Sequence, residues 1–292
     1  MYVGKKTAGR KVFEGINTTV IVLICAIMLY PFLYVAACSF SGDIPILGGK
    51  VTLWPVEFQT KAYSLVLEYP MIGRSYVNTI LYTVVGTAVN MILSTLGAYS
   101  LSRRDLPGRK FFTFFIAFTM LFTGGLIPTY LLVRSLGLID TFWVMILPNA
   151  INTWNLIMLK TFFQETPASL LEAAKIDGSG ELNTLIRIVL PLSIPSLMTI
   201  GLFYAVGHWN GYFHAMIYLS TPARNPLQIV LRDIVLQNSM ERQFASMQQG
   251  ARTSVESVKY ATIMFATIPI LCVYPFIQKY FVKGVMLGSI KE

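Results

Sequence analysis

The chain has 292 residues, of which 54% are hydrophobic and only 13% are charged, and its formal net charge is +9. Soluble domains carry about 25% charged residues, so this composition excludes an ordinary soluble protein. Six stretches have no Asp, Glu, Lys or Arg: Ile16–Cys38, Val77–Tyr99, Phe111–Val133, Thr141–Leu159, Ile188–Pro222 and Tyr260–Gln278. Because each can cross a hydrocarbon core of about 30 Å as a helix, they predict an all-α polytopic membrane protein with six transmembrane helices.

Residues 1–15 form a basic tail before the first predicted span. That span ends in Val35–Cys38, which is similar to a lipoprotein cleavage site and would make the first apolar stretch a signal peptide. The stretch is long and five more spans follow it, so we interpret it as a membrane helix. Residues 39–73 then form a first outside loop, with turn residues at Ser41–Asp43 and Gly48–Gly49.

The hairpin Ser102–Lys110 predicts the orientation, because it is short and contains four basic residues against Asp105 alone. Lys and Arg accumulate in short cytoplasmic loops. The hairpin, both termini and the polar loop 165–191 are therefore expected in the cytoplasm. The net positive charge then reflects topology and contact with anionic lipid, and no nucleic-acid partner is expected.

The polar loop 165–191, before the fifth span, predicts two short helices joined by a glycine turn. Thr166 suits the N-cap of the first helix, and Gly178 suits the left-handed residue that ends it. Ser179 can cap the second helix, which Pro191 then limits. Such a pair could form a DNA-binding helix-turn-helix, but its net charge is near zero and it lies between membrane spans.

The charge-free stretch of the fifth span is too long for one helix, so the span is placed near Pro195–Leu219. A second outside loop follows at residues 220–259, the six-span region ends at residue 284, and residues 285–292 form a cytoplasmic tail. Four arginines of the second loop would suit a uronate ligand or a solvated surface: Arg224, Arg232, Arg242 and Arg252.

Polar side chains within spans are costly and tend to face a partner helix or a watery path. The candidates for a translocation path are Asn149, Asn152 and Asn155 in the fourth span and Tyr204, His208 and Asn210 in the fifth. The three asparagines recur every three residues, so on one helix they would drift slowly round one side. Amide, hydroxyl and aromatic groups suit a sugar, but such side chains also bridge membrane helices, and both interpretations stay open.

Several kinds of catalytic chemistry have no motif in this sequence. There is no GxxxxGK[ST] phosphate loop, HExxH, CxxC or GxSxG. The two histidines, His208 and His214, are six residues apart and do not share a helix face. No charged residue lies within a span, which argues against an ion-coupled carrier. We therefore expect no catalytic residue and no metal site, and the energy for transport must come from a partner.

The spacing of Glu172–Ala174, Gly178 and Ile188–Pro191 resembles the EAA loop of ABC importer permeases, the cytoplasmic helix that docks into an ATPase. The remaining chain resembles the carbohydrate-type, MalG-like permeases, in their polysaccharide and oligosaccharide branch, which includes alginate and rhamnogalacturonan transporters. The segments that carry this resemblance are Gly124–Pro128, Leu136–Thr141, Lys160–Phe163, Trp209–Asn210 and Gln278–Val285.

The resemblance implies an ABC type I importer permease fold in a bacterial inner membrane. It implies a second permease subunit, an ABC ATPase dimer that binds ATP and Mg²⁺, and an extracellular solute-binding protein. This chain itself would bind no cofactor, and its tail 285–292 would reach toward the ATPase. The residues expected to couple the chain to the ATPase are Glu172, Ala173, Ala174, Asp177, Gly178 and Pro191, with Glu172 paired to a basic residue of the ATPase and the alanines allowing close packing.

The function expected from these features is that of a permease subunit in an ATP-driven, binding-protein-dependent importer of acidic oligosaccharide or polysaccharide. It would form half of the translocation pore. An ABC permease for another solute, such as an amino acid or peptide, is the first alternative. A self-sufficient membrane carrier or enzyme is the second, and it would act without partners.

Overall fold

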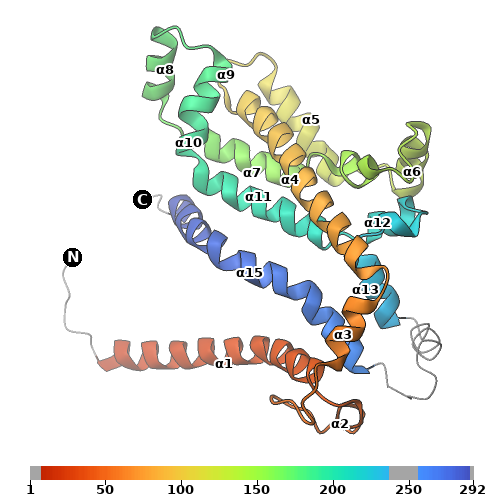
Figure 1. The fold of residues 1–292 in the computed structure, drawn as a ribbon. Coiled ribbons are helices and arrows are strands. Elements are labelled where there is room, and N and C mark those ends of the chain that lie inside the picture. The colour runs from red at the N-terminus through yellow and green to blue at the C-terminus, as the bar shows by residue number, and fades with distance from the viewer. Residues whose placement is uncertain (1–7, 237–255, 290–292) are drawn as a thin grey trace. The chain divides into compact units, whose positions relative to one another are not determined.

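The computed structural model describes residues 8–236 and 256–289, and every regular element in them is helical (Figure 1). Among the described residues, three helices are long and apolar enough to span a membrane. They are α1 (Ala8–Ser39), α4 (Ile72–Ser102) and the part Glu256–Pro275 of α15 (Glu256–Ser289). Within the described residues there are up to six spans if each of three bent helix pairs crosses once, which matches the six predicted.

Two of the bent pairs interrupt a stretch that the sequence predicts as one straight span, and the third bends between the predicted loop 165–191 and the predicted fifth span. The pairs are α5 (Arg109–Leu121) with α6 (Leu126–Ser135) at 114°, Phe142–Asn149 with α7 (Thr153–Gln164) at 56°, and Glu181–Leu192 with α11 (Ile194–Trp209) at 87°. The segment Phe142–Asn149 consists of two 3-10 turns, η1 (Phe142–Met145) and η2 (Leu147–Asn149). The first bend lies at Gly124–Gly125, where Gly125 has a φ of 83°, a conformation that glycine adopts without strain.

The predicted fifth span, Pro195–Leu219, is wrong as a single helix. α11 ends at Trp209, and a separate short helix, α12 (Phe213–Tyr218), follows. Gly211 lies in the connection between them, where its amide donates to the His208 carbonyl at 3.2 Å in a tight turn. The turn contains no charged residue, which is why charge patterning alone does not detect it.

The chain divides into two compact units. One is Met1–Tyr69 with Leu231–Thr267, and the other is Pro70–Val230 with Ile268–Glu292. The predicted tails and second outside loop extend beyond the described residues at 1–7, 237–255 and 290–292. Arg242 and Arg252 lie in that part, and α15 continues to Ser289 through the start of the predicted C-terminal tail.

In the first unit, the end of α1 packs against the first outside loop, which holds α2 (Asp43–Leu47) and α3 (Lys61–Glu68). The core there consists of Ala37, Cys38, Ile46 and Val51, with Tyr34, Val56 and Tyr260 at its edge. Cys38 is fully buried and lies inside α1. This is consistent with our interpretation of the first apolar stretch as a membrane helix.

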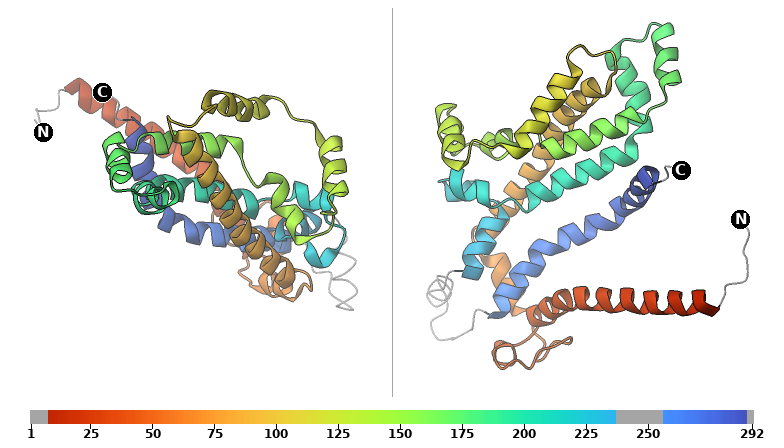
Figure 2. Two further views of the ribbon diagram at one scale, coloured as in Figure 1. Left: turned by 90° about the horizontal axis from the view of Figure 1, so that it is seen from above. Right: turned by 180° about the vertical axis from the view of Figure 1, so that it is seen from behind.

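In the second unit, α7 and α11 lie against α4, as Figures 1 and 2 show. The buried face of α4 is largely polar or small. Gly86, Asn90, Ser94 and Ala98 are buried on the side of α7 and α11, whereas Asn78 and Thr79 hydrogen-bond to residues 223–227. The outward side of α4 carries exposed apolar residues instead: Val77, Ile80, Leu81, Val84, Ile92, Leu93 and Leu96. This distribution suits lipid, where small and polar residues make the helix contacts and apolar residues face the hydrocarbon.

Candidate functional site

The loop between the fourth and fifth spans forms two helical segments joined by a glycine, as predicted. α8 (Ala168–Ile176) ends at Gly178, which has a φ of 72°. The Ser179 amide donates to the Ala174 carbonyl at 2.9 Å, and the Gly178 amide donates to the Lys175 carbonyl at 3.2 Å. This pair of bonds is the Schellman motif, which needs a left-handed residue at this position. The predicted role of Gly178 in ending the helix is therefore confirmed.

The predicted caps of the two helices are wrong. Pro167, not Thr166, occupies the N-cap of α8, because the Thr166 amide still bonds the Phe163 carbonyl at the end of α7. Gly180, not Ser179, is the N-cap of the second segment, and no side-chain bond caps either helix. The Ser179 hydroxyl instead accepts from Asn183 Nδ2 at 2.7 Å, which ties the turn to the following helix.

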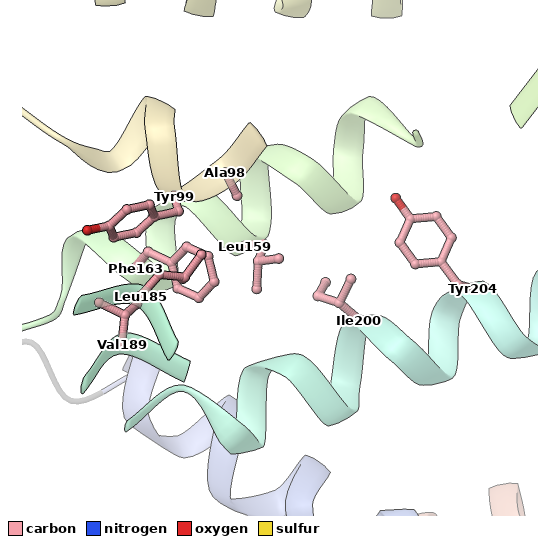
Figure 3. Close-up of a cluster of buried hydrophobic side chains, with 8 residues drawn as sticks. All are labelled: Ala98, Tyr99, Leu159, Phe163, Leu185, Val189, Ile200 and Tyr204. Carbon is pink, nitrogen blue, oxygen red and sulfur yellow. The ribbon is translucent and has the colours of Figure 1, made fainter. Parts of the chain in front are cut away.

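The second segment runs continuously through α9 (Glu181–Thr184), a π-helical turn η3 (Leu185–Val189) and α10 (Leu190–Leu192). Pro191 lies in the last turn, consistent with its predicted role of limiting the helix. Leu185 and Val189 are buried against α4, α7 and α11, in a cluster with Ala98, Tyr99, Leu159, Phe163, Ile200 and Tyr204 (Figure 3). The loop is thus held on the ends of the spans by an apolar core.

The two sides of α8 differ. Leu171, Glu172 and Lys175 line a cavity beside the hairpin 102–110, and their spacing places them on one helix face. Ala173 and Asp177 lie on the opposite face and are exposed, whereas Ala174 is buried. Large apolar side chains are exposed on both segments: Leu170 and Ile176 on α8, of which Ile176 is 85% exposed, and Leu182 and Ile186 on the second segment. A cluster of apolar side chains on a polar loop is typical of a protein interface.

Glu181 is a functional candidate that the sequence analysis missed. Tyr99 donates from its hydroxyl to Glu181 Oε2 at 2.6 Å, and Arg103 donates from Nη2 to Oε1 at 3.2 Å. Both partners lie at the end of α4, so Glu181 connects the loop directly to that helix. We call these three residues the clasp. The sequence signal for it is slight: an acidic residue in the first turn of a helix also favours the helix dipole by itself.

A second group of predicted residues meets along α4, at the break before α7. Asn90 donates from Nδ2 to the carbonyls of Asn149 and Ala150, at 2.8 and 2.9 Å, and its Oδ1 lies 2.7 Å from His208 Nε2. Asn149 Nδ2 lies 2.8 Å from His214 Nδ1. Asn90 therefore satisfies backbone carbonyls that the helix break leaves without a helical partner.

Three of the remaining predicted path residues, Asn152, Asn155 and Tyr204, also lie at this break. Asn152 is the N-cap of α7, and its Oδ1 accepts from the amide of the buried Asn155 at 3.0 Å. The Tyr204 hydroxyl accepts from the Asn152 amide at 3.0 Å and lies 2.7 Å from Ser94 Oγ. The expectation that the three asparagines share one helix is wrong, because Asn149 lies in η2 before the break. Asn149, Asn152 and Asn210 are exposed, whereas Tyr204 is buried.

On the opposite side of the fold, Asp140 joins two connections between helices. Its Oδ1 accepts from the amides of Ser220 and Thr221 at 3.1 Å, and its Oδ2 lies 3.0 Å from Arg224 Nη1. The hydroxyl and amide of Thr221 lower the pKa of the Asp140 carboxyl to about 2, with a smaller contribution from Arg224. Arg224 is therefore already paired within the protein, as is Arg232, which lies 3.7 Å from Asp233.

Residues 91–287 match the family described as "Binding-protein-dependent transport system inner membrane component". The Bacillus subtilis polygalacturonan/rhamnogalacturonan transport system permease protein YtcP is 47% identical over 96% of this chain and 99% of its own length. The Bacillus subtilis protein LplC is 44% identical over 98% of this chain and 97% of its own length. A crystal structure of a bacterial ABC transporter involved in the import of the acidic polysaccharide alginate contains a similar chain, with a TM-score of 0.89 and 36% identity over 96% of this chain and 100% of the other.

Proposed function

We propose a function for this chain from one premise: it belongs to the family of binding-protein-dependent transport system inner membrane components. Its fold is that of an ABC importer permease. The chain is a transmembrane permease subunit that forms half of a translocation pore and couples this pore to ATP hydrolysis on a partner. It carries out no catalytic step, and ATP and Mg²⁺ bind to the partner ATPase.

The cargo is a carbohydrate, of the acidic oligosaccharide or polysaccharide class. This assignment rests on similarity to a permease named for polygalacturonan and rhamnogalacturonan, and to an importer of the acidic polysaccharide alginate. Both similarities extend over 96% of this chain. They therefore include the spans as well as the loop between the fourth and fifth spans.

The exposed outward face of α8 is the observation that carries the coupling role. Ile176 and Leu170 project apolar surface from a polar loop, and Ala173 between them leaves room for close approach. We assign this face to the ATPase, with a second permease completing the pore and a solute-binding protein delivering cargo from outside. The close turn at Gly178 fixes the angle between the docked helix and α9.

The clasp supports the orientation as well. The Arg103–Glu181 contact joins the loop 165–191 to the basic hairpin 102–110 and supports assigning both to the same side of the membrane. Since basic short loops are cytoplasmic, that side is the cytoplasm of a bacterium, and the chain lies in its inner membrane with both termini inside. Asp140 and Arg224 then belong to the outside connections.

We assign Asn149 and Asn210 to the translocation path, because both are polar and exposed at the ends of helices within the spans. Asn152, Asn155, Tyr204 and His208 hold the helix break together, and we assign them to the support of this path. An exposed amide can exchange hydrogen bonds with sugar hydroxyls without leaving a buried group unpaired.

The test is a mild-detergent purification of the tagged chain from its native membranes, with mass spectrometry of all retained proteins. The wild type is expected to retain a second permease and an ATPase. An Ile176→Glu variant is expected to lose the ATPase and keep the permease, because a charge replaces exposed apolar surface in the docking face. Leu136→Glu is the matched control, since Leu136 is 62% exposed and lies in an outside turn.

Two results would contradict the proposal. If the wild-type chain is purified without any partner protein, the result would favour the self-sufficient carrier or enzyme instead. Retention of the ATPase by Ile176→Glu, at the same level as by Leu136→Glu, would exclude the outward face of α8 as the docking surface.

A further inference from the structure

A cavity of about 760 Å³ lies between the hairpin 102–110 and α8. Six charged side chains line it: Arg103, Arg104, Arg109 and Lys175 are basic, and Asp105 and Glu172 are acidic. A cavity of this size with a cationic excess is suited to an anionic ligand rather than to a neutral one.

The basic side chains of the cavity differ in how many bonds they already make within the protein. Arg103 is used by the clasp and by Asp105, whose Oδ1 lies 3.5 Å from its Nε. Arg109 donates from Nε to the Leu101 carbonyl at 2.9 Å, and this bond leaves its two terminal nitrogens available to a ligand. Among residues 8–236 and 256–289, no carboxylate lies within ion-pair distance of Arg104, Arg109 or Lys175. Three cations are therefore available to a ligand.

The uncharged part of the wall combines the polar residues Ser102, Gln164 and Thr166 with apolar residues from the ends of the spans. Tyr99 from α4, Phe163 from α7 and Val189 from η3 line the cavity and also form part of the buried cluster in Figure 3. The hairpin that supplies Arg104 and Arg109 directly connects α4 to α5. The cavity thus has an apolar floor at the end of the membrane helices and a cationic rim in the flanking loop.

We propose that this cavity binds the phosphate headgroup of an anionic phospholipid, with Arg104, Arg109 and Lys175 as the phosphate ligands and the apolar floor against the glycerol and first acyl carbons. Basic pockets between spans on the cytoplasmic side bind such headgroups. The leaflet is assigned through the proposed orientation, and in that respect the inference rests on the proposed function. A bound lipid would connect the hairpin to α8 and so restrain the docking helix.

The geometry of α8 favours lipid over an acidic segment of the ATPase. Leu171, Glu172 and Lys175 face the cavity, whereas Leu170 and Ala173 lie on the other side of the helix. An ATPase bound to the outward side leaves the cavity side free, and this arrangement replaces the expectation that Glu172 pairs with the ATPase. The cavity floor is also continuous with the spans, which soluble proteins do not reach.

The test uses the intact importer, stripped of lipid in detergent and titrated with phosphatidylglycerol or phosphatidylcholine, with bound lipid counted by native mass spectrometry. The variant is Arg104→Gln/Lys175→Gln. The control is Lys11→Gln/Lys110→Gln, which removes two exposed basic charges that do not line the cavity. Since each basic residue near an anionic surface contributes about a factor of five to binding, the variant is expected to bind phosphatidylglycerol roughly 30-fold more weakly, while the control matches the wild type.

Three outcomes would overturn the inference. Equal binding of phosphatidylglycerol by variant and wild type would exclude the cavity as the site. Displacement of the lipid by excess inorganic phosphate would identify a soluble anion as the ligand. Binding to the permease pair that disappears when the ATPase is added would assign the cavity to the ATPase. Loss of the ATPase from the wild type, in contrast, would contradict the proposed function itself. Equal melting temperatures of the variant and the wild type in phosphatidylcholine are the control that the variant is folded.

Discussion

Replacement of Glu181 by alanine tests whether the clasp couples the docking loop to the membrane helices. The substitution removes both the 2.6 Å bond from Tyr99 and the 3.2 Å contact with Arg103. It leaves the outward face of α8 and the buried residues Leu185 and Val189 unchanged. We therefore expect the loop to stay folded and the ATPase to stay bound.

The magnitude follows from the exposure of the partners. The Glu181 side chain is 61% exposed and the Arg103 side chain 16%, so solvent screening limits their ion pair to about 0.5–1 kcal/mol. A hydrogen bond to a charged acceptor contributes about 1.5–3 kcal/mol, and the partly exposed Tyr99 bond belongs at the lower end. The clasp then contributes about 2 kcal/mol to holding the loop on α4, a factor of roughly 30 in the equilibrium between attached and detached loop.

The assay is the importer reconstituted in proteoliposomes, with ATP hydrolysis and cargo uptake measured together. Glu181→Ala is expected to keep its ATPase activity and to lose most uptake per ATP hydrolysed, because movements of the docked helix no longer reach α4. Tyr99→Phe removes only the phenol bond and is expected to give a smaller loss in the same direction. An unchanged uptake-to-hydrolysis ratio in Glu181→Ala would refute this role of the clasp, and loss of the ATPase would show that Glu181 supports the fold of the docking face instead.

Three further predictions concern the helix packing and the outside connection. Gly86→Ala places a Cβ 2.5 Å from the ring of His208 and is expected to destabilise the complex by about 1–3 kcal/mol in thermal unfolding; an unchanged melting temperature would show that α4 and α11 can separate freely. Asn90→Leu leaves two backbone carbonyls without a donor and is expected to cost more than Asn90→Asp does at low pH, where the protonated acid can still donate; equal melting temperatures of the two variants would contradict the assigned bonds. Asp140→Asn is expected to be less stable than the wild type at neutral pH. The folded pKa of about 2 lies below the usual value near 3.9, so the carboxylate of Asp140 stabilises the fold above about pH 4 and loses this effect as the pH falls toward 2. The melting temperatures of Asp140→Asn and the wild type should therefore converge over that pH range. A difference that stays constant with pH would exclude the Thr221 and Arg224 contacts as its source.

The sequence predicts an all-helical chain with up to six apolar segments that can span a membrane, because the cost of a charge in hydrocarbon confines charged residues to the loops. Charge patterning does not predict the helix breaks at Gly125 and Asn152, because neither turn contains a charged residue. Glycine at position 178 is predictable, since few other residues adopt a positive φ. The predicted caps at Thr166 and Ser179 are wrong, because the backbone amides of these residues hydrogen-bond to the preceding helical turns.

Glu181 was missed for a different reason. An acidic side chain in a polar loop has the same sequence signature whether it is solvated or bonded across 82 residues to Tyr99. The same limit applies to the predicted path residues. A sequence places Asn152, Tyr204 and His208 within spans, but only the structure shows that a helix break and Asn90 occupy their polar atoms.

The polar inner face of α4 restricts how this helix can move. A helix whose amides and hydroxyls point inward and whose aliphatic side chains point outward cannot turn about its long axis without exposing Asn90 to hydrocarbon, at a cost of several kcal/mol. Rotation of α4 about its long axis is therefore unfavourable, whereas tilting of the helix does not carry this cost. Any movement of α4 that preserves its contacts with α7 and α11 carries these two helices with it, so the three helices act as one mechanical element.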